Sequence, residues 1–207
     1  MLHTQTVEPG TLSVLKKLMK IPELGKFSLV GGTALALKFG HRKSIDLDLF
    51  SHEDFTNNQI TDILRRVFTD YRLESSAEKF GVFCYIENVK VDIVKHPHAL
   101  ISDIEETDGI RMYGTPDIIA MKINAIMGRG RKKDFWDLHT IFEHYSLPEV
   151  IGFYEAKFHE QRLLISIPTV ITYFTDADES EEPASLKGQT WKQVKKDIEK
   201  KVRDYLK

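Results

Sequence analysis

Two aspartates alternate with aliphatic residues in the segment SIDLDLF, residues 44–50. This period of two is typical of a β-strand with one buried face, so Asp46 and Asp48 are expected to point to the same side. Two ionised carboxylates held that close repel each other, and one takes up a proton unless a cation lies between them. Mg²⁺, with Mn²⁺ as an alternative, suits the pair because it binds a few carboxylates together with phosphate oxygens. The expected strand has Ile45, Leu47 and Leu49 on its buried face and Ser44, Asp46 and Asp48 on the other.

The aspartate pair is also compatible with a calcium-binding loop or with a strand that has no ligand. A calcium-binding loop needs a central glycine and oxygen donors at alternate positions, whereas DLDLFSHED, residues 46–54, has no glycine and places leucines between its first acids. A solvent-facing edge strand whose acids have no function is the simpler alternative. The aspartate pair alone would favour that simpler alternative.

A third carboxylate strengthens the metal-site hypothesis. Asp92 lies in KVDIV, residues 90–94, a second alternating segment with Val91 and Ile93 on its opposite face. If the two strands are neighbours, Asp92 joins Asp46 and Asp48. Three such carboxylates can hold two metal ions around a triphosphate, which aligns an attacking hydroxyl with a pyrophosphate leaving group. These three aspartates are therefore the predicted metal ligands and catalytic carboxylates.

Two adjacent glycines precede the aspartates and suggest a phosphate site. Gly31 and Gly32 end an apolar segment and open a helical one, where small residues let phosphate approach backbone N–H groups. Thr33 adds a hydroxyl, and the N-terminus of a helix favours negative charge. A lone Gly-Gly is weak evidence, but here thirteen residues separate it from the Asp46–Asp48 pair. We therefore expect phosphate to bind at residues 31–33.

Two longer stretches resemble a known family. LVGGTALALKFGHRKSIDLDLF, residues 29–50, resembles the signature of the polymerase-beta-like nucleotidyltransferase superfamily and, more narrowly, of the AbiEii/AbiGii toxin family of type IV toxin–antitoxin and phage-defence systems. PDIIAMKINAIMGRGRKKDFWDLHTI, residues 116–141, resembles the second signature of that family: a helix with a lysine, a basic turn and then KDFWDL. The last sixty residues match nothing in the family pattern.

The resemblance implies a role for each matching residue. Asp46, Asp48 and Asp92 would bind metal, and Gly31, Gly32 and Thr33 would meet the triphosphate. Lys122 would reach the phosphates from the second helix, unless it is a solvated lysine on an exposed face. Asp134 would orient Lys122 or the incoming base, and a helix-start acid favoured by the dipole is an equal alternative. Arg42 and Ser44 precede the aspartate strand and are assigned to nucleotide binding. The position of Arg42 at the mouth of the expected site favours a phosphate contact over its alternative, a simple pair with an acid.

Several further charged residues give weaker signals. Arg129, Arg131, Lys132 and Lys133 form a local basic run that can track an RNA backbone, and a solvated turn accounts for it equally well. His41, His96 and His98 have no spacing typical of zinc sites, so they are expected to be surface residues. The five acids within residues 176–183 lack a turn glycine and are expected to form a solvated linker.

The segments that position these residues predict a mixed sheet packed by helices. Alternating and helical periodicities give a first helix around 12–19, strands at 27–32, 44–50, 81–86 and 89–95, helices at 33–40 and 57–71, and a hairpin at Glu87–Asn88. Thr115 is expected to cap the next helix, and Phe135, Leu138, Phe142 and Tyr145 to form the buried stripe of another. A basic terminal helix is expected to dock on the body of the protein or on a partner. Its apolar stripe consists of Trp191, Val194, Ile198, Val202 and Tyr205.

The resulting prediction is an α/β nucleotidyltransferase core at 1–110, a helical region completing the site at 111–175, and an acidic linker with an amphipathic helix at 176–207. The 207 residues carry a net charge of −2, a single cysteine and no apolar run long enough for a bilayer, which favours a cytoplasmic protein with no membrane partner. The predicted reaction moves a nucleoside monophosphate from an NTP to RNA such as tRNA, or to a protein hydroxyl, and a cognate antitoxin is a predicted partner. A small-molecule nucleotidyltransferase and a non-catalytic nucleotide-binding module are the alternatives.

Overall fold

A mixed β-sheet forms the centre of the protein. The structure, a computed structural model, describes residues 1–77 and 80–207. Its strands are β1 (Ser28–Val30), β2 (Leu47–Ser51), β3 (Tyr71–Ala77), β4 (Gly81–Ile86), β5 (Val89–Lys95), β6 (Glu105–Thr107) and β7 (Ile110–Met112). Within the described residues they form one seven-stranded sheet in the order β3-β4-β5-β2-β1-β7-β6. The β2–β5 and β1–β7 pairs are parallel and the others antiparallel, so the predicted mixed α/β sheet is confirmed.

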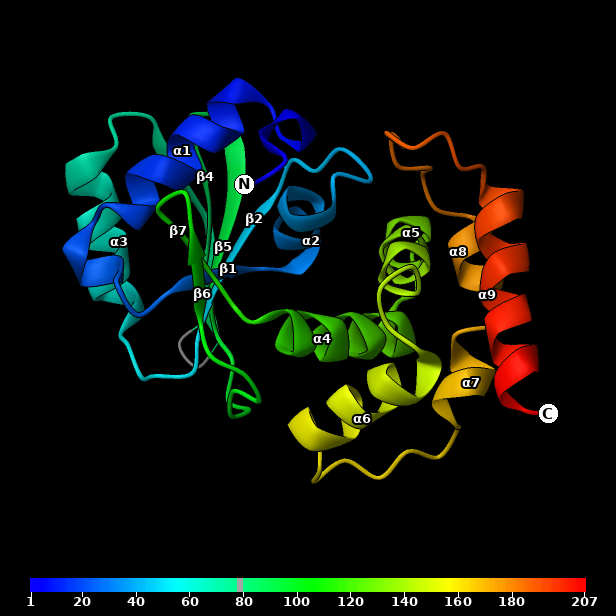
Figure 1. Ribbon diagram of the computed structural model, residues 1–207. Helices are drawn as coiled ribbons and strands as arrows, with labels where there is room; N and C mark the ends of the chain where they lie inside the picture. The colour runs from blue at the N-terminus through cyan, green and yellow to red at the C-terminus, as the bar shows by residue number, and fades with distance from the viewer. Residues whose placement is uncertain (78–79) are drawn as a thin grey trace.

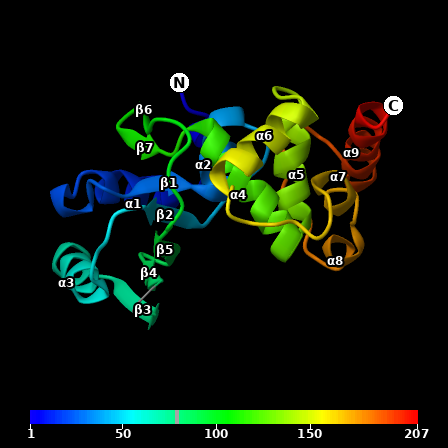
Figure 2. The same ribbon diagram turned by 90° about the horizontal axis from the view of Figure 1, so that it is seen from below.

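Helices cover both faces of this sheet. They are α1 (Pro9–Met19), α2 (Gly31–Phe39), α3 (Asn57–Val67), α4 (Thr115–Gly128), α5 (Lys132–Ile141), α6 (Leu147–Lys157), α7 (Ile167–Val170), α8 (Thr175–Asp178) and α9 (Trp191–Tyr205), with short 3₁₀ turns η1 (Thr4–Thr6) and η2 (Pro22–Leu24). Helices α1 and α3 lie on one face, and α2 and α4–α9 lie on the other (Figures 1 and 2). Among the described helices, none combines the length and apolar character that a membrane crossing requires.

The strand β2 is shorter than its sequence predicts. It begins at Leu47 and its burial alternates along LDLFS, as expected for a strand with one core face. Ser44, Ile45 and Asp46 precede the strand, and Ile45 is 64% exposed instead of facing the core. The alternating pattern therefore places Asp48 correctly, whereas Asp46 lies on the segment that leads into the strand.

Three strands were not predicted. The helix expected to reach Tyr71 ends at Val67, because Phe68 has an extended backbone, and Tyr71 begins β3. The edge strands β6 and β7 have three residues each, too few to show a period, and pair through a turn at Asp108–Gly109. The predicted hairpin at Glu87–Asn88 is confirmed: both residues have positive φ, at 50° and 63°, which is typical of a type I′ turn.

The caps of two helices also differ from the expectation. The N-cap of α4 is Gly114, and Thr115 is the first helical residue. Its hydroxyl lies 2.8 Å from the Lys38 amine and 3.3 Å from Glu105. In the next helix Phe135 and Leu138 are buried as predicted, whereas α5 ends at Ile141, before Tyr145.

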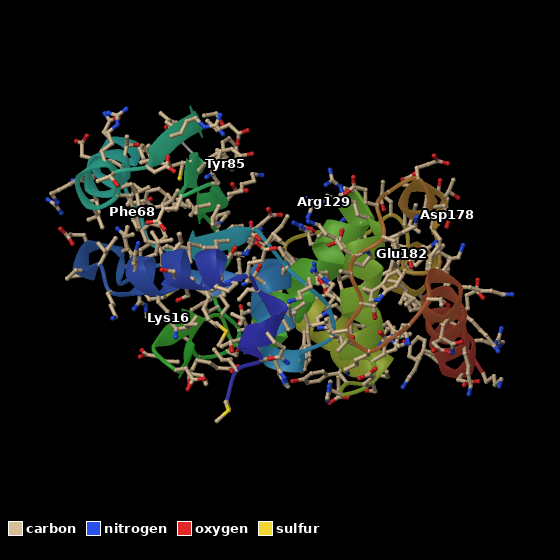
Figure 3. The ribbon with its side chains drawn as sticks, turned by 90° about the horizontal axis from the view of Figure 1, so that it is seen from above. Lys16, Phe68, Tyr85, Arg129, Asp178 and Glu182 are labelled. Atoms are coloured by element: carbon tan, nitrogen blue, oxygen red, sulfur yellow. The ribbon has the colours of Figure 1, made fainter. Side chains whose placement is uncertain are left out.

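The acidic segment 176–183 is not only a solvated linker. Its first residues belong to α8, where Asp178 accepts hydrogen bonds from the Trp191 indole and from Lys195. Just after it, the Lys43 N–H donates to the Ala184 carbonyl, which ties this segment to the residues ahead of β2. Figure 3 shows Asp178 and Glu182 beside the helices, far from Phe68 and Tyr85 at the other end of the molecule.

The terminal helix docks on the body as predicted. Val194, Ile198 and Val202 are buried, and α9 packs against α5. The Trp191 ring is stacked on Trp136 with centroids 5.7 Å apart. An amphipathic helix with this buried stripe contributes to the core of the chain itself.

Candidate active site

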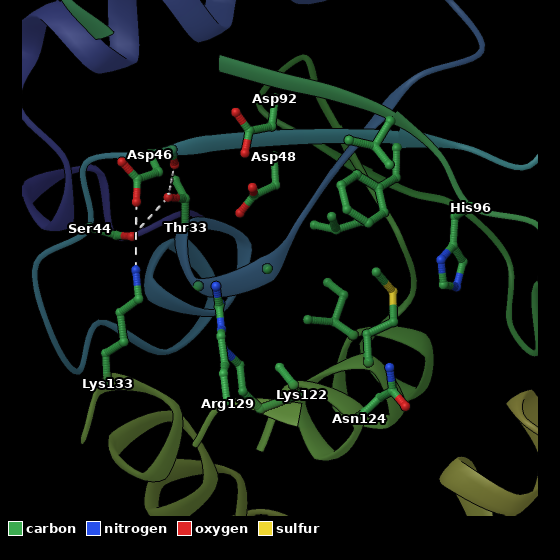
Figure 4. Close-up of a pocket in the computed structure, with 18 of the residues that line it drawn as sticks. Thr33, Ser44, Asp46, Asp48, Asp92, His96, Lys122, Asn124, Arg129 and Lys133 are labelled. Carbon is green, nitrogen blue, oxygen red and sulfur yellow. Dashed lines mark hydrogen bonds and ion pairs between the residues drawn. The ribbon is translucent and has the colours of Figure 1, made fainter. Parts of the chain in front are cut away.

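A pocket of about 580 Å³ opens between the sheet and α4 (Figure 4). The start of α2, the strands β2 and β5, the helix α4 and the turn that follows α4 all contribute to its wall. It therefore collects segments that are distant in the chain. The predicted site residues that line it are Gly31, Gly32, Thr33, Arg42, Ser44, Asp46, Asp48, Asp92 and Lys122.

Strand register brings the carboxylates together. In the parallel pairing of β2 with β5, Asp48 is the direct partner of Asp92. Asp46, two residues before Asp48, reaches the same end of the pocket (Figure 4). Asp48 has no hydrogen bond or ion pair to any described residue, while Asp92 lies 3.5 Å from the Lys90 amine.

The negative charges of this cluster are only partly balanced by nearby lysines. Burial raises the pKa of Asp48 to about 6, and repulsion by Asp92 and Asp46 adds to this effect, while Lys122 and Lys133 offset part of it. Burial also raises the pKa of Asp92, although Lys90 opposes that shift. A carboxylate cluster of this kind is stabilised by a cation.

The two glycines make room for side chains of the protein itself. Gly31 has φ +70°, and a Cβ there would lie 2.6 Å from the Asp48 carboxylate. A Cβ on Gly32 would lie 2.2 Å from the Arg42 guanidinium. Gly31 requires glycine because of its positive φ, and a side chain at Gly32 would have to displace the Arg42 guanidinium. In this structure Arg42 occupies the space beside Gly32 that the sequence suggested for phosphate.

Thr33 and Ser44 fix the segment ahead of β2. The Thr33 side chain is buried, contacts the Ser44 hydroxyl at 2.8 Å and hydrogen-bonds the backbone carbonyl of Asp46. The Thr33 hydroxyl is thus engaged with protein groups. Its contacts hold Asp46 at the mouth of the pocket. The sequence pattern predicts, in addition, that Thr33 itself contacts phosphate.

Asp137, which the sequence patterns do not single out, is the centre of a buried ion network. Its carboxylate accepts hydrogen bonds from Arg42 Nε at 2.6 Å, from Arg42 Nη2 at 2.9 Å and from His41 Nε2 at 2.7 Å. The Lys122 amine lies 2.8 Å from its second oxygen. Burial alone would raise the pKa of Asp137, but Arg42 and Lys122 hold it well below its usual value. The sequence does contain one indication of this role: Asp137 lies between the apolar residues Trp136 and Leu138 on a helix, so its carboxylate is expected to be buried and to need a partner.

This network corrects the expectation for His41. His41 was expected at the surface, but its side chain is fully buried against Asp137. Arg42 is 3% exposed and donates two hydrogen bonds to the same carboxylate, so it pairs with an acid, as one of the two expectations had it. Arg42 also lines the pocket, and its assignment to nucleotide binding stays a prediction.

Lys122 is a buried member of the same network. Its side chain is 6% exposed, so the exposed-lysine alternative is wrong, and its amine lies 2.8 Å from Asp134 as well. Burial opposes the charge of Lys122, but Asp137 and Asp134 outweigh it and raise the Lys122 pKa. Asp134 also accepts from the Arg131 N–H at the start of α5, so it caps the helix and orients Lys122 at once.

Comparison with known proteins gives the family. A model described as nucleotidyl transferase AbiEii toxin, type IV TA system, matches residues 13–206. The chain belongs to the AbiEii nucleotidyltransferase toxin family. The uncharacterized protein aq_aa25 of Aquifex aeolicus (strain VF5) is 29% identical over 201 residues, covering 93% of this chain and 94% of that protein. The match confirms the predicted enzyme class.

Solved structures show the same fold at low sequence identity. A protein from H. pylori has a TM-score of 0.57 and 15% identity, with 99% of this chain and 96% of that chain covered. MenT4, the nucleotidyltransferase toxin Rv2826c from Mycobacterium tuberculosis H37Rv, has a TM-score of 0.54 and 12% identity over 93% of this chain and 82% of that chain. The family model, which matches residues 13–206, also extends past the two motifs into the last sixty residues.

The four basic residues of the run 129–133 in this AbiEii-family chain have different partners. Lys133 lies 3.6 Å from the Asp46 carboxylate, and Arg129 lies 3.8 Å from Asp134 with its side chain 55% exposed. Lys132 is hydrogen-bonded to Ser180. Of the four, Arg131 is the exposed residue whose side chain forms no ion pair with the described residues.

The carboxylates suit a divalent cation in this family member. One Asp92 oxygen is buried without a hydrogen-bond partner among the described residues. Hard carboxylate oxygens are the donors that Mg²⁺ and Mn²⁺ prefer. Asp46 faces Lys133, and no three His, Cys, Asp or Glu side chains of residues 1–77 and 80–207 form a complete ligand set as placed. Asp48 and Asp92 are therefore the carboxylates most available to bind a metal ion. Lys133 would compete with the metal ion for Asp46.

Proposed function

We propose that this AbiEii-family enzyme transfers a nucleoside monophosphate from an NTP to a hydroxyl of an RNA acceptor in a Mg²⁺-dependent reaction. The observation that supports it most is the direct pairing of Asp48 with Asp92 in a pocket where nearby lysines offset only part of the charge of the acids. Mg²⁺ bound by Asp46, Asp48 and Asp92 would neutralise developing phosphate charge.

Side chains of the pocket would also accept the proton and stabilise the triphosphate. A free Asp92 oxygen accepts the proton of the acceptor hydroxyl, whose oxygen then forms a bond to the α-phosphorus while the bond to the leaving pyrophosphate breaks. Lys122, Arg129 and Lys133 line the same pocket and supply positive charge toward the triphosphate.

An RNA acceptor is favoured by the charges at the pocket mouth. Arg129 lines the pocket with an exposed side chain, and the exposed Arg131 follows in the same turn. Cations in such a position neutralise backbone phosphates. A toxin of a type IV system also implies an antitoxin partner. A role in phage defence is part of this proposal.

The test incubates the protein with each labelled NTP, Mg²⁺ and total tRNA, with EDTA and Asp48→Asn as controls. Label transferred to tRNA with release of pyrophosphate is the expected result. Label on a protein or on an aminoglycoside in place of RNA would reassign the acceptor. NTP binding without transfer to any acceptor would instead indicate a regulatory module.

A further inference from the structure

The pocket has an aromatic end that the proposed chemistry leaves unused. Figure 4 shows His96 and Asn124 at the end away from Asp46 and Lys133. Phe50 and Phe158 line the same pocket. The acidic end and the aromatic end are thus parts of one cavity with different chemistry.

Strand periodicity sets the separation of the two ends. Phe50 follows Asp48 by two residues on β2 and so points to the same face of the sheet. His96 follows Asp92 by four residues just past β5, which corresponds to about 13 Å along an extended chain. A ligand whose phosphates lie at the carboxylates therefore extends toward Phe50 and His96.

His96 is held as a neutral ring with an unused polar atom. Its ring centroid lies 5.8 Å from that of Phe50 and 6.3 Å from that of Phe158. Its Nε2 is buried and has no hydrogen-bond partner among the described residues. Burial, followed by repulsion from Lys157, lowers the pKa of His96 to about 4, which keeps the imidazole uncharged at neutral pH.

Asn124 presents a free amide to this end of the pocket. It lies on α4, two residues beyond Lys122, and its side chain is exposed. Within the described part of the chain no hydrogen bond engages the amide, which carries both donors and an acceptor.

We infer that the aromatic end binds the nucleobase of the NTP, with Phe50 as the stacking surface and Asn124 as the residue that selects the base. This inference rests on the proposed NTP substrate. A nucleobase has an apolar face and a polar edge, and stacking on an aromatic side chain stabilises its binding whichever base is bound. An amide that hydrogen-bonds a base edge discriminates between bases, since the wrong base leaves polar groups unpaired.

The experiment measures equilibrium dissociation constants for ATP, GTP, CTP and UTP by titration calorimetry, together with kcat/KM for transfer. Asn124→Ala and Asn124→Asp test base selection, and Phe50→Leu tests stacking. Asn58→Ala, an exposed asparagine on α3, and Phe153→Leu, a half-buried phenylalanine on α6, are the matched controls. Asn124→Asp keeps the shape of the side chain but replaces its donors with acceptors.

The expected result separates the two residues. Asn124→Ala should reduce the preference among the four NTPs by at least about tenfold, and Asn124→Asp should change their order. Phe50→Leu should weaken binding of all four by about tenfold without changing their order. Both controls should match the parent.

Two outcomes would overturn the inference. If the parent binds and transfers NTPs but both Asn124 variants keep its base preference, the base lies elsewhere and only this inference fails. If the parent binds no NTP, the proposed function fails and this inference fails with it.

Discussion

Asp48 and Asp92 are direct partners in the parallel pairing of β2 with β5, and Asp48 forms no ion pair with any described residue, whereas Asp92 has only the half-exposed Lys90. The nearest cation to either is Lys90, 3.5 Å from Asp92 and 40% exposed, so solvent screens it. The fold thus holds like charges together inside a pocket, which costs stability. Such an arrangement persists where a ligand uses it, and the pair is the focus of the first two predictions.

Asp48→Asn should abolish Mg²⁺-dependent transfer while the protein stays folded. The substitution removes the carboxylate that is flanked by both Asp46 and Asp92 and leaves the side-chain volume unchanged. The measurement is label transfer from NTP to tRNA, with circular dichroism to establish folding. Asp62→Asn, an exposed aspartate on α3, is the matched control and should be fully active. Full activity of Asp48→Asn would exclude the metal-site assignment.

The stability of the metal-free protein should depend on pH through Asp48. Its pKa of about 6 in the folded protein lies above the usual value near 3.9, so the folded state binds this proton more tightly than the unfolded state. The resulting stabilisation is present below about pH 4 and is lost as the pH rises to about 6. In EDTA, Asp48→Asn should therefore be more stable than the parent at pH 7.5, by up to about 3 kcal/mol.

Urea unfolding of both proteins at pH 4 and pH 7.5 measures this difference. The advantage of Asp48→Asn should shrink as the pH falls, because the parent carboxyl is then protonated. A difference that is the same at both pH values would show that Asp48 titrates normally.

Asp137→Asn should destabilise the protein strongly. The substitution leaves the buried cations Arg42 and Lys122 without the charge that both face, and breaking such a pair costs about 3–5 kcal/mol. The measurement is the free energy of unfolding in urea. Asp54→Asn is the control, because Asp54 pairs with Lys95 at the surface with its side chain 90% exposed and should change stability by less than about 1 kcal/mol. Equal effects of the two substitutions would refute a structural role for the Asp137 network.

Arg131→Glu should weaken RNA binding without changing NTP affinity. Arg131 is an exposed cation of the turn after α4 whose side chain forms no ion pair with the described residues, whereas Lys133 faces Asp46 and would disturb the site itself if reversed. For single-stranded RNA each phosphate contact contributes a slope of about −0.7 in log K against log salt, so the slope should become shallower by about that amount.

Fluorescence anisotropy with tRNA at several salt concentrations tests this expectation. Lys16→Glu is the control, because Lys16 is an exposed lysine on α1, well separated from Arg129 in Figure 3. If Arg131→Glu behaves like the control, RNA does not approach along this turn.

The sequence was sufficient for the features that depend on neighbours in the chain. The alternation around Asp48 and Asp92 follows from a strand with one buried face, and the positive φ of Glu87 and Asn88 follows from a tight hairpin. The sequence also predicts that the glycine pair lies where a strand gives way to a helix, and α2 begins at Gly31 directly after β1. These local rules, with the family resemblance, were enough to predict the fold class and the enzyme class.

Only the tertiary structure decided which charges meet. Asp137 lies far along the chain from His41 and Arg42, and no local pattern indicates that α5 packs against α2 and carries this acid to them. The same packing fills the space beside Gly32 with Arg42, buries Lys122 and turns Lys133 toward Asp46. The physical reason is that a buried charge is tolerated only beside its partner, and the partner is set by how the helices pack.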